Sequence, residues 1–126
     1  MISVNKAGRK TPLILIYCGS FSYFLSDCLG PDQPVYGFFD NGWLNGLKSD
    51  FDSVETLAKE YIYQLRKVLP QGPYILGGHS FGGVIAYEMS VQLKKSGQVV
   101  PLITLFDSMS PYAERPGYSG INILYI

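Results

Sequence analysis

A serine within a short glycine-rich stretch is the first feature of this sequence that suggests chemistry. Ser80 lies in the pentapeptide GHSFG at residues 78–82, which fits the pattern G-x-S-x-G. An apolar segment precedes this stretch and an amphipathic segment follows it, so the serine falls at a turn between a strand and a helix. Such a turn holds the serine in a strained backbone and directs the first N–H groups of the helix toward it. The pattern predicts a nucleophilic serine, with the N–H of Phe81 as the first donor to a developing oxyanion.

The same residues also fit less reactive roles. A glycine-rich loop between a strand and a helix can bind phosphate, or it can be a plain tight turn. A nucleophilic serine needs a base, and the only histidine of the chain is its neighbour, His79. Because adjacent residues of a strand point to opposite sides, the ring of His79 should not reach the hydroxyl of Ser80. We therefore expect His79 to be a packed polar residue beside the turn rather than the base.

An aspartate at the end of the next apolar segment is the second candidate. Asp107 directly follows residues 99–106, which read as a strand. In open α/β sheets the functional groups gather at the carboxyl ends of the strands, where an aspartate can orient a catalytic imidazole. It can equally well cap the turn at residues 108–111. The residues alone leave both roles open.

Alternating strands and helices are the elements that must position these side chains. Short apolar runs predict strands at residues 13–17, 35–39, 74–77 and 99–106. Residues 21–29 fit a short helix, and helical periodicity predicts two further helices at residues 54–69 and 81–95. Asp52 should cap the second helix, with Glu55 completing a capping box, and Gly97 should end the third. This order indicates an α/β fold with a parallel sheet, in which residues 99–106 would be a bare edge unless further strands cover them.

Composition excludes several classes of protein. The 126 residues suggest one domain at most. The 10 basic and 10 acidic side chains balance, so the composition does not indicate binding to nucleic acid or to a charged membrane surface. The apolar run at residues 13–18 is too short for a membrane span or a secretion signal. Cys18 and Cys28 do not make a disulfide framework, so we expect buried or half-buried free thiols. These features predict a cytoplasmic protein.

Three linked segments resemble a known family. Residues 30–37 (GPDQPVYG), 72–89 (GPYILGGHSFGGVIAYEM) and 105–111 (LFDSMSP) are similar to segments of the thioesterase domains of nonribosomal peptide and polyketide synthetases. The resemblance covers about residues 12–115. It divides the chain into an N-terminal extension at residues 1–11 and a partial thioesterase domain at residues 12–126.

The resemblance implies both a fold and a reaction. The fold is that of the α/β-hydrolases, a mostly parallel sheet with flanking helices. Ser80 is then the nucleophile and Asp107 the acid of the catalytic triad. The serine takes an acyl or peptidyl chain from the phosphopantetheine thioester of a partner carrier domain, and water or a nucleophile within the chain releases it. No metal and no cofactor of its own are implied, while the acyl substrate and the choice between hydrolysis and cyclisation stay open.

Two departures from the family pattern accompany the resemblance. The loop after the first strand is shorter than in the family, which leaves Gly19 and Ser20 as candidates for the second oxyanion donor. The family's base histidine comes well after the aspartate, past a lid, whereas this sequence ends at Ile126. We therefore expect an N-terminal portion, truncated before the lid and the last strands and inactive by itself. The alternatives are a non-catalytic module that binds carrier domains or acyl chains, and another kind of serine esterase.

Overall fold

A computed structural model describes residues 1–39, 53–108 and 121–126 of the chain. Within these residues a central sheet has six strands in the order β1-β3-β2-β4-β5-β6. The strands are β1 (Ile2–Asn5), β2 (Leu13–Ile16), β3 (Val35–Phe38), β4 (Ile75–His79), β5 (Ile103–Phe106) and β6 (Ile123–Tyr125). The helices are α1 (Phe21–Leu29), α2 (Val54–Val68) and α3 (Phe81–Lys95).

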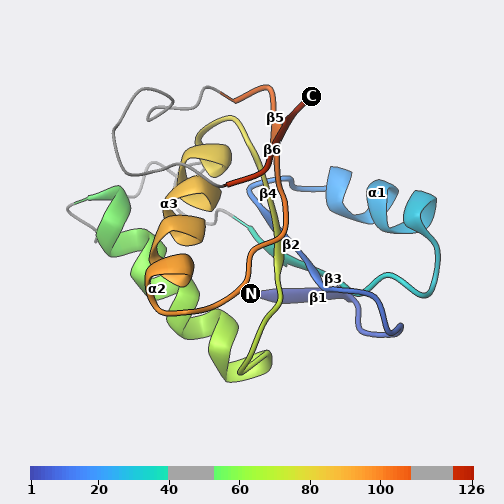
Figure 1. Ribbon diagram of the computed structural model, residues 1–126. Helices are drawn as coiled ribbons and strands as arrows, with labels where there is room; N and C mark the ends of the chain where they lie inside the picture. The colour runs from blue at the N-terminus through green and yellow to red at the C-terminus, as the bar shows by residue number, and fades with distance from the viewer. Residues whose placement is uncertain (40–52, 109–120) are drawn as a thin grey trace.

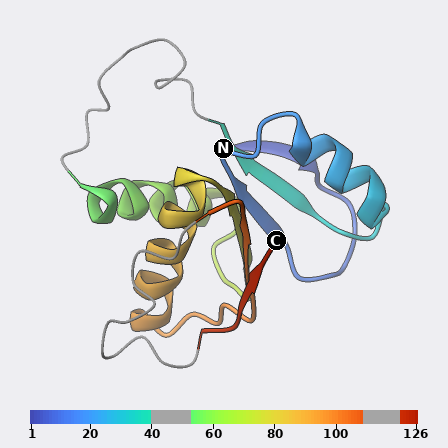
Figure 2. The same cartoon turned by 90° about the horizontal axis from the view of Figure 1, so that it is seen from above.

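The described elements form three layers. Strand β1 runs antiparallel to β3, and all other neighbouring strands are parallel. Helices α2 and α3 pack together on one face of the sheet, and α1 lies on the opposite face (Figures 1 and 2). Because parallel strands share a direction, the carboxyl ends of β2, β4 and β5 meet at one edge of the sheet.

Strand β2 shows why the sequence folds in this way. All four of its residues are buried, and successive side chains enter different clusters. Ile14 and Ile16 pack with residues of α2 and α3, while Leu13 and Leu15 pack on the face that α1 covers. A strand that is covered on both faces needs a continuous apolar run, as the sequence predicted.

Two strands at the margins of the sheet were not foreseen. Residues 2–5 lie in the segment expected to be an extension, yet they form β1 and pair with β3. The strand that ends at Phe106 was expected to be a bare edge unless a further strand covered it, and β6 pairs with it in parallel. That strand also begins later than predicted, at Ile103.

The ends of the helices agree closely with the sequence pattern, with one correction. Helices α1 and α3 span the predicted residues. Helix α2 is capped by Ser53, whose hydroxyl accepts a hydrogen bond from the N–H of Thr56 at 3.1 Å. The predicted cap, Asp52, lies outside the described residues. In the described part of the chain no helix is long and apolar enough to cross a lipid bilayer.

Candidate active site

Three neighbouring strands end in the same unusual backbone conformation. The residues that follow β2, β4 and β5 have a positive φ, which is 58° at Tyr17, 51° at Ser80 and 45° at Asp107. Among the described residues they are the only ones other than glycine with a positive φ. Residues other than glycine rarely adopt this backbone conformation. It persists where the surrounding structure enforces it, often at functional sites. The backbone therefore marks the carboxyl edge of the sheet as the candidate active site.

The backbone of Ser80 is fixed from several sides while its side chain is exposed. Its N–H donates to the carbonyl oxygen of Phe106 at 3.0 Å. Its own carbonyl oxygen accepts from the N–H of Gly83 at 3.0 Å and from the hydroxyl of Ser108 at 2.7 Å. Ser80 is also the N-cap residue of α3, but its side chain makes no capping hydrogen bond. The hydroxyl is thus left at the solvent-exposed edge, at the N-terminus of a helix whose dipole favours negative charge.

Small residues allow this turn to close. A side chain at Gly78 would collide with the backbone of Gly82, in the first turn of α3. A side chain at Gly82 would collide with the carbonyl oxygen of Ile16, at the end of β2. The first turn of α3 therefore contacts the ends of β4 and β2 directly, and this contact positions Ser80.

Replacing Gly82 by alanine should destabilise the fold by about 2 kcal/mol or more, because the added methyl group meets backbone atoms that cannot rotate away. Thermal unfolding monitored by circular dichroism measures this loss. Gly72→Ala is the control, since its methyl group meets only side-chain atoms and none closer than 3.2 Å. A Gly82→Ala protein as stable as the Gly72→Ala protein would contradict the tight contact.

His79, the neighbour of Ser80, was not expected to act as its base. It is the last residue of β4 and is exposed, contrary to the expectation that it would be packed. The reason is its place at the rim of the sheet, where the strand ends. Within the described residues its imidazole makes no hydrogen bond with Ser80.

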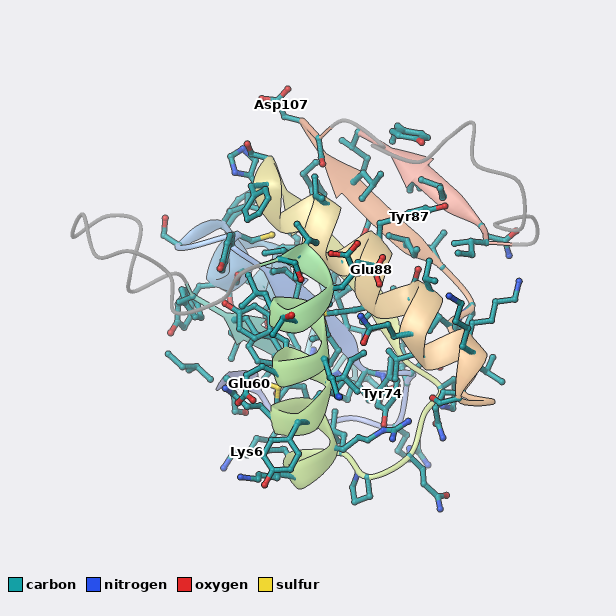
Figure 3. All side chains as sticks on the ribbon, turned by 90° about the vertical axis from the view of Figure 1, so that its left-hand side faces the viewer. Lys6, Glu60, Tyr74, Tyr87, Glu88 and Asp107 are labelled. Atoms are coloured by element: carbon teal, nitrogen blue, oxygen red, sulfur yellow. The ribbon has the colours of Figure 1, made fainter. Side chains whose placement is uncertain are left out.

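Asp107 lies beside the serine turn on the neighbouring strand. Phe106, just before it, is the Cα partner of His79, just before Ser80. The N–H of Asp107 donates to the carbonyl oxygen of Ile126 at 2.9 Å. Its side chain is exposed and points away from the sheet at the same edge (Figure 3). Most of the turn that Asp107 was alternatively expected to cap, residues 109–111, lies outside the described part of the chain.

The short loop between β2 and α1 contains the candidates for a second oxyanion donor. Gly19 has a φ of 52°, and Ser20 is the N-cap residue of α1 without a side-chain capping bond. The N–H groups of the next two residues turn back to the carbonyl oxygens of Cys18 and Gly19, both at 3.1 Å. Among the described residues, the N–H groups of Gly19 and Ser20 donate no such bond.

Cys18 ties this loop to the serine turn. Its thiol lies 3.6 Å from the carbonyl oxygen of Ile16 and also hydrogen-bonds with the backbone of His79. Burial raises the pKa of the Cys18 thiol to about 11, and the hydrogen bond with His79 only partly offsets this. The thiol is therefore protonated at neutral pH and is a packing group rather than a second nucleophile.

The two cysteines should differ in reactivity, because Cys18 is buried and Cys28 is exposed. Both thiols were expected to be buried or half-buried, and this expectation was wrong for Cys28. At pH 8 a pKa near 11 leaves about 0.1% of the Cys18 thiol as thiolate. Brief treatment with iodoacetamide at that pH, followed by peptide mapping, should find Cys28 alkylated and Cys18 intact. After unfolding in guanidinium both should react. Equal reaction of the two in the folded protein would mean that the loop opens readily.

A mostly parallel sheet that presents a serine at a strained turn between a strand and a helix defines an α/β-hydrolase. The sequence profile of the thioesterase domain matches residues 45–121. The chain therefore belongs to the thioesterase domain family.

Relatives and solved structures agree with this assignment. The chain is 40% identical to malpibaldin synthetase of Mortierella alpina over 114 residues. This aligned region covers 87% of this chain and 2% of that protein. It is 31% identical to the NocB thioesterase domain from the nocardicin cluster, with a TM-score of 0.69, over 80% of this chain and 46% of that one. A four-domain nonribosomal peptide synthetase bound to AMP and glycine is 34% identical, with a TM-score of 0.75, over 87% of this chain and 9% of that one.

Further relatives are polyketide synthases of fungi and bacteria. The chain spans between 2% and 5% of the length of the first three curated relatives. The family match thus concerns one domain of much longer proteins.

Proposed function

We propose that this chain provides the nucleophile and the acid of a serine thioesterase that releases an acyl or peptidyl chain from the phosphopantetheine thioester of a carrier domain. The observation that carries the proposal is the left-handed turn at Ser80, which holds an exposed hydroxyl at the N-terminus of α3. The family match supports the reaction class, because thioesterase domains act on thioesters. On this proposal the phosphopantetheine belongs to the carrier, and the chain needs no metal or cofactor of its own.

The proposed reaction has two steps. The hydroxyl oxygen of Ser80 attacks the thioester carbonyl carbon and gives its proton to the base. The carbon–sulfur bond then breaks, the phosphopantetheine sulfur takes up that proton and leaves as a thiol, and the acyl group stays on the serine as an ester. Water or a nucleophile within the acyl chain then attacks the ester and frees Ser80. In both steps a negative charge develops on the carbonyl oxygen. We propose the N–H groups of Phe81 and of Gly19 or Ser20 as its hydrogen-bond donors.

The base in this proposal is an imidazole that Asp107 orients. The position of Asp107, one strand beside the serine turn, supports this role. His79 is the only histidine in the sequence, and its ring makes no hydrogen bond to the serine hydroxyl within the described residues. We therefore propose that the imidazole is supplied from outside these 126 residues. We accordingly propose that the 126 residues by themselves do not turn over thioesters.

Acylation of the protein that carries this sequence tests the proposal. The protein is incubated with acetyl or decanoyl pantetheine thioester, and intact mass spectrometry follows the adduct while a thiol reagent follows released pantetheine. We expect an adduct of the acyl mass, mapped to the peptide that contains Ser80, together with free thiol. Binding of the thioester without an adduct would instead favour a non-catalytic module. Faster reaction with an oxygen ester of the same acid would favour another class of esterase.

A further inference from the structure

Of the three left-handed residues at the carboxyl edge of the sheet, which we call the active edge, Tyr17 is the one that the proposed reaction does not use. Its side chain leaves β2 on the face that carries α2 and meets Tyr61 of that helix. The two hydroxyl oxygens lie 2.9 Å apart, and the two rings meet edge-on, with centroids 6.3 Å apart and planes at 80°. The ring of Tyr61 in turn stacks on Phe38 of β3, at 4.4 Å and 14°. The hydroxyl pair therefore joins the end of β2 to a helix that is itself held against the sheet.

The backbone of Tyr17 connects this contact to the site. Its N–H donates to the carbonyl oxygen of Phe38 at 2.8 Å, and the loop at residues 18–20 begins directly after it. Its Cβ lies against the first turn of α3, since a methyl group added at Gly82 would come within 2.9 Å of it. Tyr17 thus borders both the loop that carries Gly19 and Ser20 and the turn that carries Ser80.

The conformation of Tyr17 needs support from its surroundings. A left-handed backbone costs roughly 1–2 kcal/mol for an ordinary residue, and it persists only where neighbouring contacts enforce it. The backbone bond to Phe38 fixes one side of the residue, and the hydroxyl pair with Tyr61 fixes the other. If the side chain were released, the chain after Tyr17 could relax, and the N–H groups of the loop would lose their direction.

We propose that Tyr61 is a positioning residue for the oxyanion loop. Through its hydroxyl bond to Tyr17 it holds residues 18–20 so that their N–H groups face the oxygen on which charge develops. This inference rests on the proposed function. Because the oxyanion exists in the transition state and not in the bound thioester, the effect falls on the rate of acylation and not on substrate binding.

The variant Tyr61→Phe keeps both the ring and its stacking on Phe38 and removes the hydroxyl. In the protein that carries this sequence we expect the acylation rate constant at saturating pantetheine thioester to fall about tenfold, less than the loss of an entire oxyanion donor. The KM should stay within about twofold, because the variant removes no contact that binds the substrate in its ground state. Backbone amide exchange at Phe21 and Ser22, whose N–H groups donate to the carbonyl oxygens of Cys18 and Gly19, should become faster. Tyr63→Phe is the matched control, because Tyr63 lies on the same helix, is 57% exposed and packs against Lys67.

A double-mutant cycle gives the second measurement. If the two hydroxyls act as one unit, Tyr17→Phe combined with Tyr61→Phe should acylate no more slowly than the slower single variant. Additive losses, a raised KM with an unchanged rate constant, or a Tyr61→Phe protein that acylates like the wild type would each overturn the positioning role. Failure of the proposed function is a different result, because the wild-type protein itself would then form no acyl adduct.

Discussion

Replacing Ser80 by alanine is expected to abolish acyl-enzyme formation and to lower turnover by about 10⁶-fold, the scale on which serine hydrolases lose activity without their nucleophile. The physical reason is that Ser80 is the only serine of the described residues with a left-handed backbone, whereas Ser20, which also begins a helix at this edge, has a φ of −62°. The hydroxyl of Ser108 instead donates to the carbonyl oxygen of Ser80. Intact mass spectrometry after incubation with an acyl-pantetheine thioester measures the loss.

Two further variants separate chemistry from folding. Ser96→Ala removes a serine at the other end of the same helix and should acylate like the wild type. Ser80→Gly should be as inactive as Ser80→Ala but more stable by about 1 kcal/mol, because glycine adopts a positive φ without steric cost. An acyl adduct that still forms in Ser80→Ala would remove Ser80 from the mechanism.

Replacing Asp107 by asparagine should lower kcat by about 10⁴-fold with little change in KM, because an amide would hold the imidazole in the wrong tautomer. Asparagine tolerates a left-handed backbone better than most residues, so the φ of 45° at this position should survive the change. Steady-state release of pantetheine thiol by the protein that carries this sequence measures the effect.

Asp27→Asn is the matched control for Asp107, since Asp27 is an exposed carboxylate on α1. We expect it to leave kcat unchanged. A loss below about tenfold in Asp107→Asn would instead give Asp107 the local turn-capping role that its sequence context also allowed.

Local patterns made most of the central fold predictable. The apolar run of β2 and the periodicity of α3 each depend on neighbouring residues, and these elements lie where the sequence placed them. Strand β1 was missed because its pairing with β3, about 30 residues away along the chain, is what makes Ile2–Asn5 a strand. The strand that covers β5 was missed for a related reason. A strand is an edge or an interior strand only through its neighbour, and here β6 provides that neighbour.

The candidate site divides in the same way. The positions of Ser80 and Asp107 follow from the sequence, because the carboxyl ends of parallel strands must meet at one edge. The left-handed backbone of Tyr17 left no local signal, since tyrosine is neither glycine nor asparagine. Its bond to Tyr61 spans 44 residues and exists only because α2 packs on that face of the sheet. Contacts of this kind depend on how helices are seated, which periodicity does not specify.

The three left-handed residues at the ends of β2, β4 and β5 also affect how much mutation the rest of the chain can absorb. Each of them costs roughly 1–2 kcal/mol, so together they lower the free energy of unfolding by about 3–6 kcal/mol. This is of the order of the whole net stability of a small domain. The buried residues beneath them must compensate for this amount before the chain has any surplus. A core substitution that a less strained sheet would tolerate therefore brings this chain closer to unfolding. The evolutionary freedom of its core is accordingly limited by the shape of its active edge.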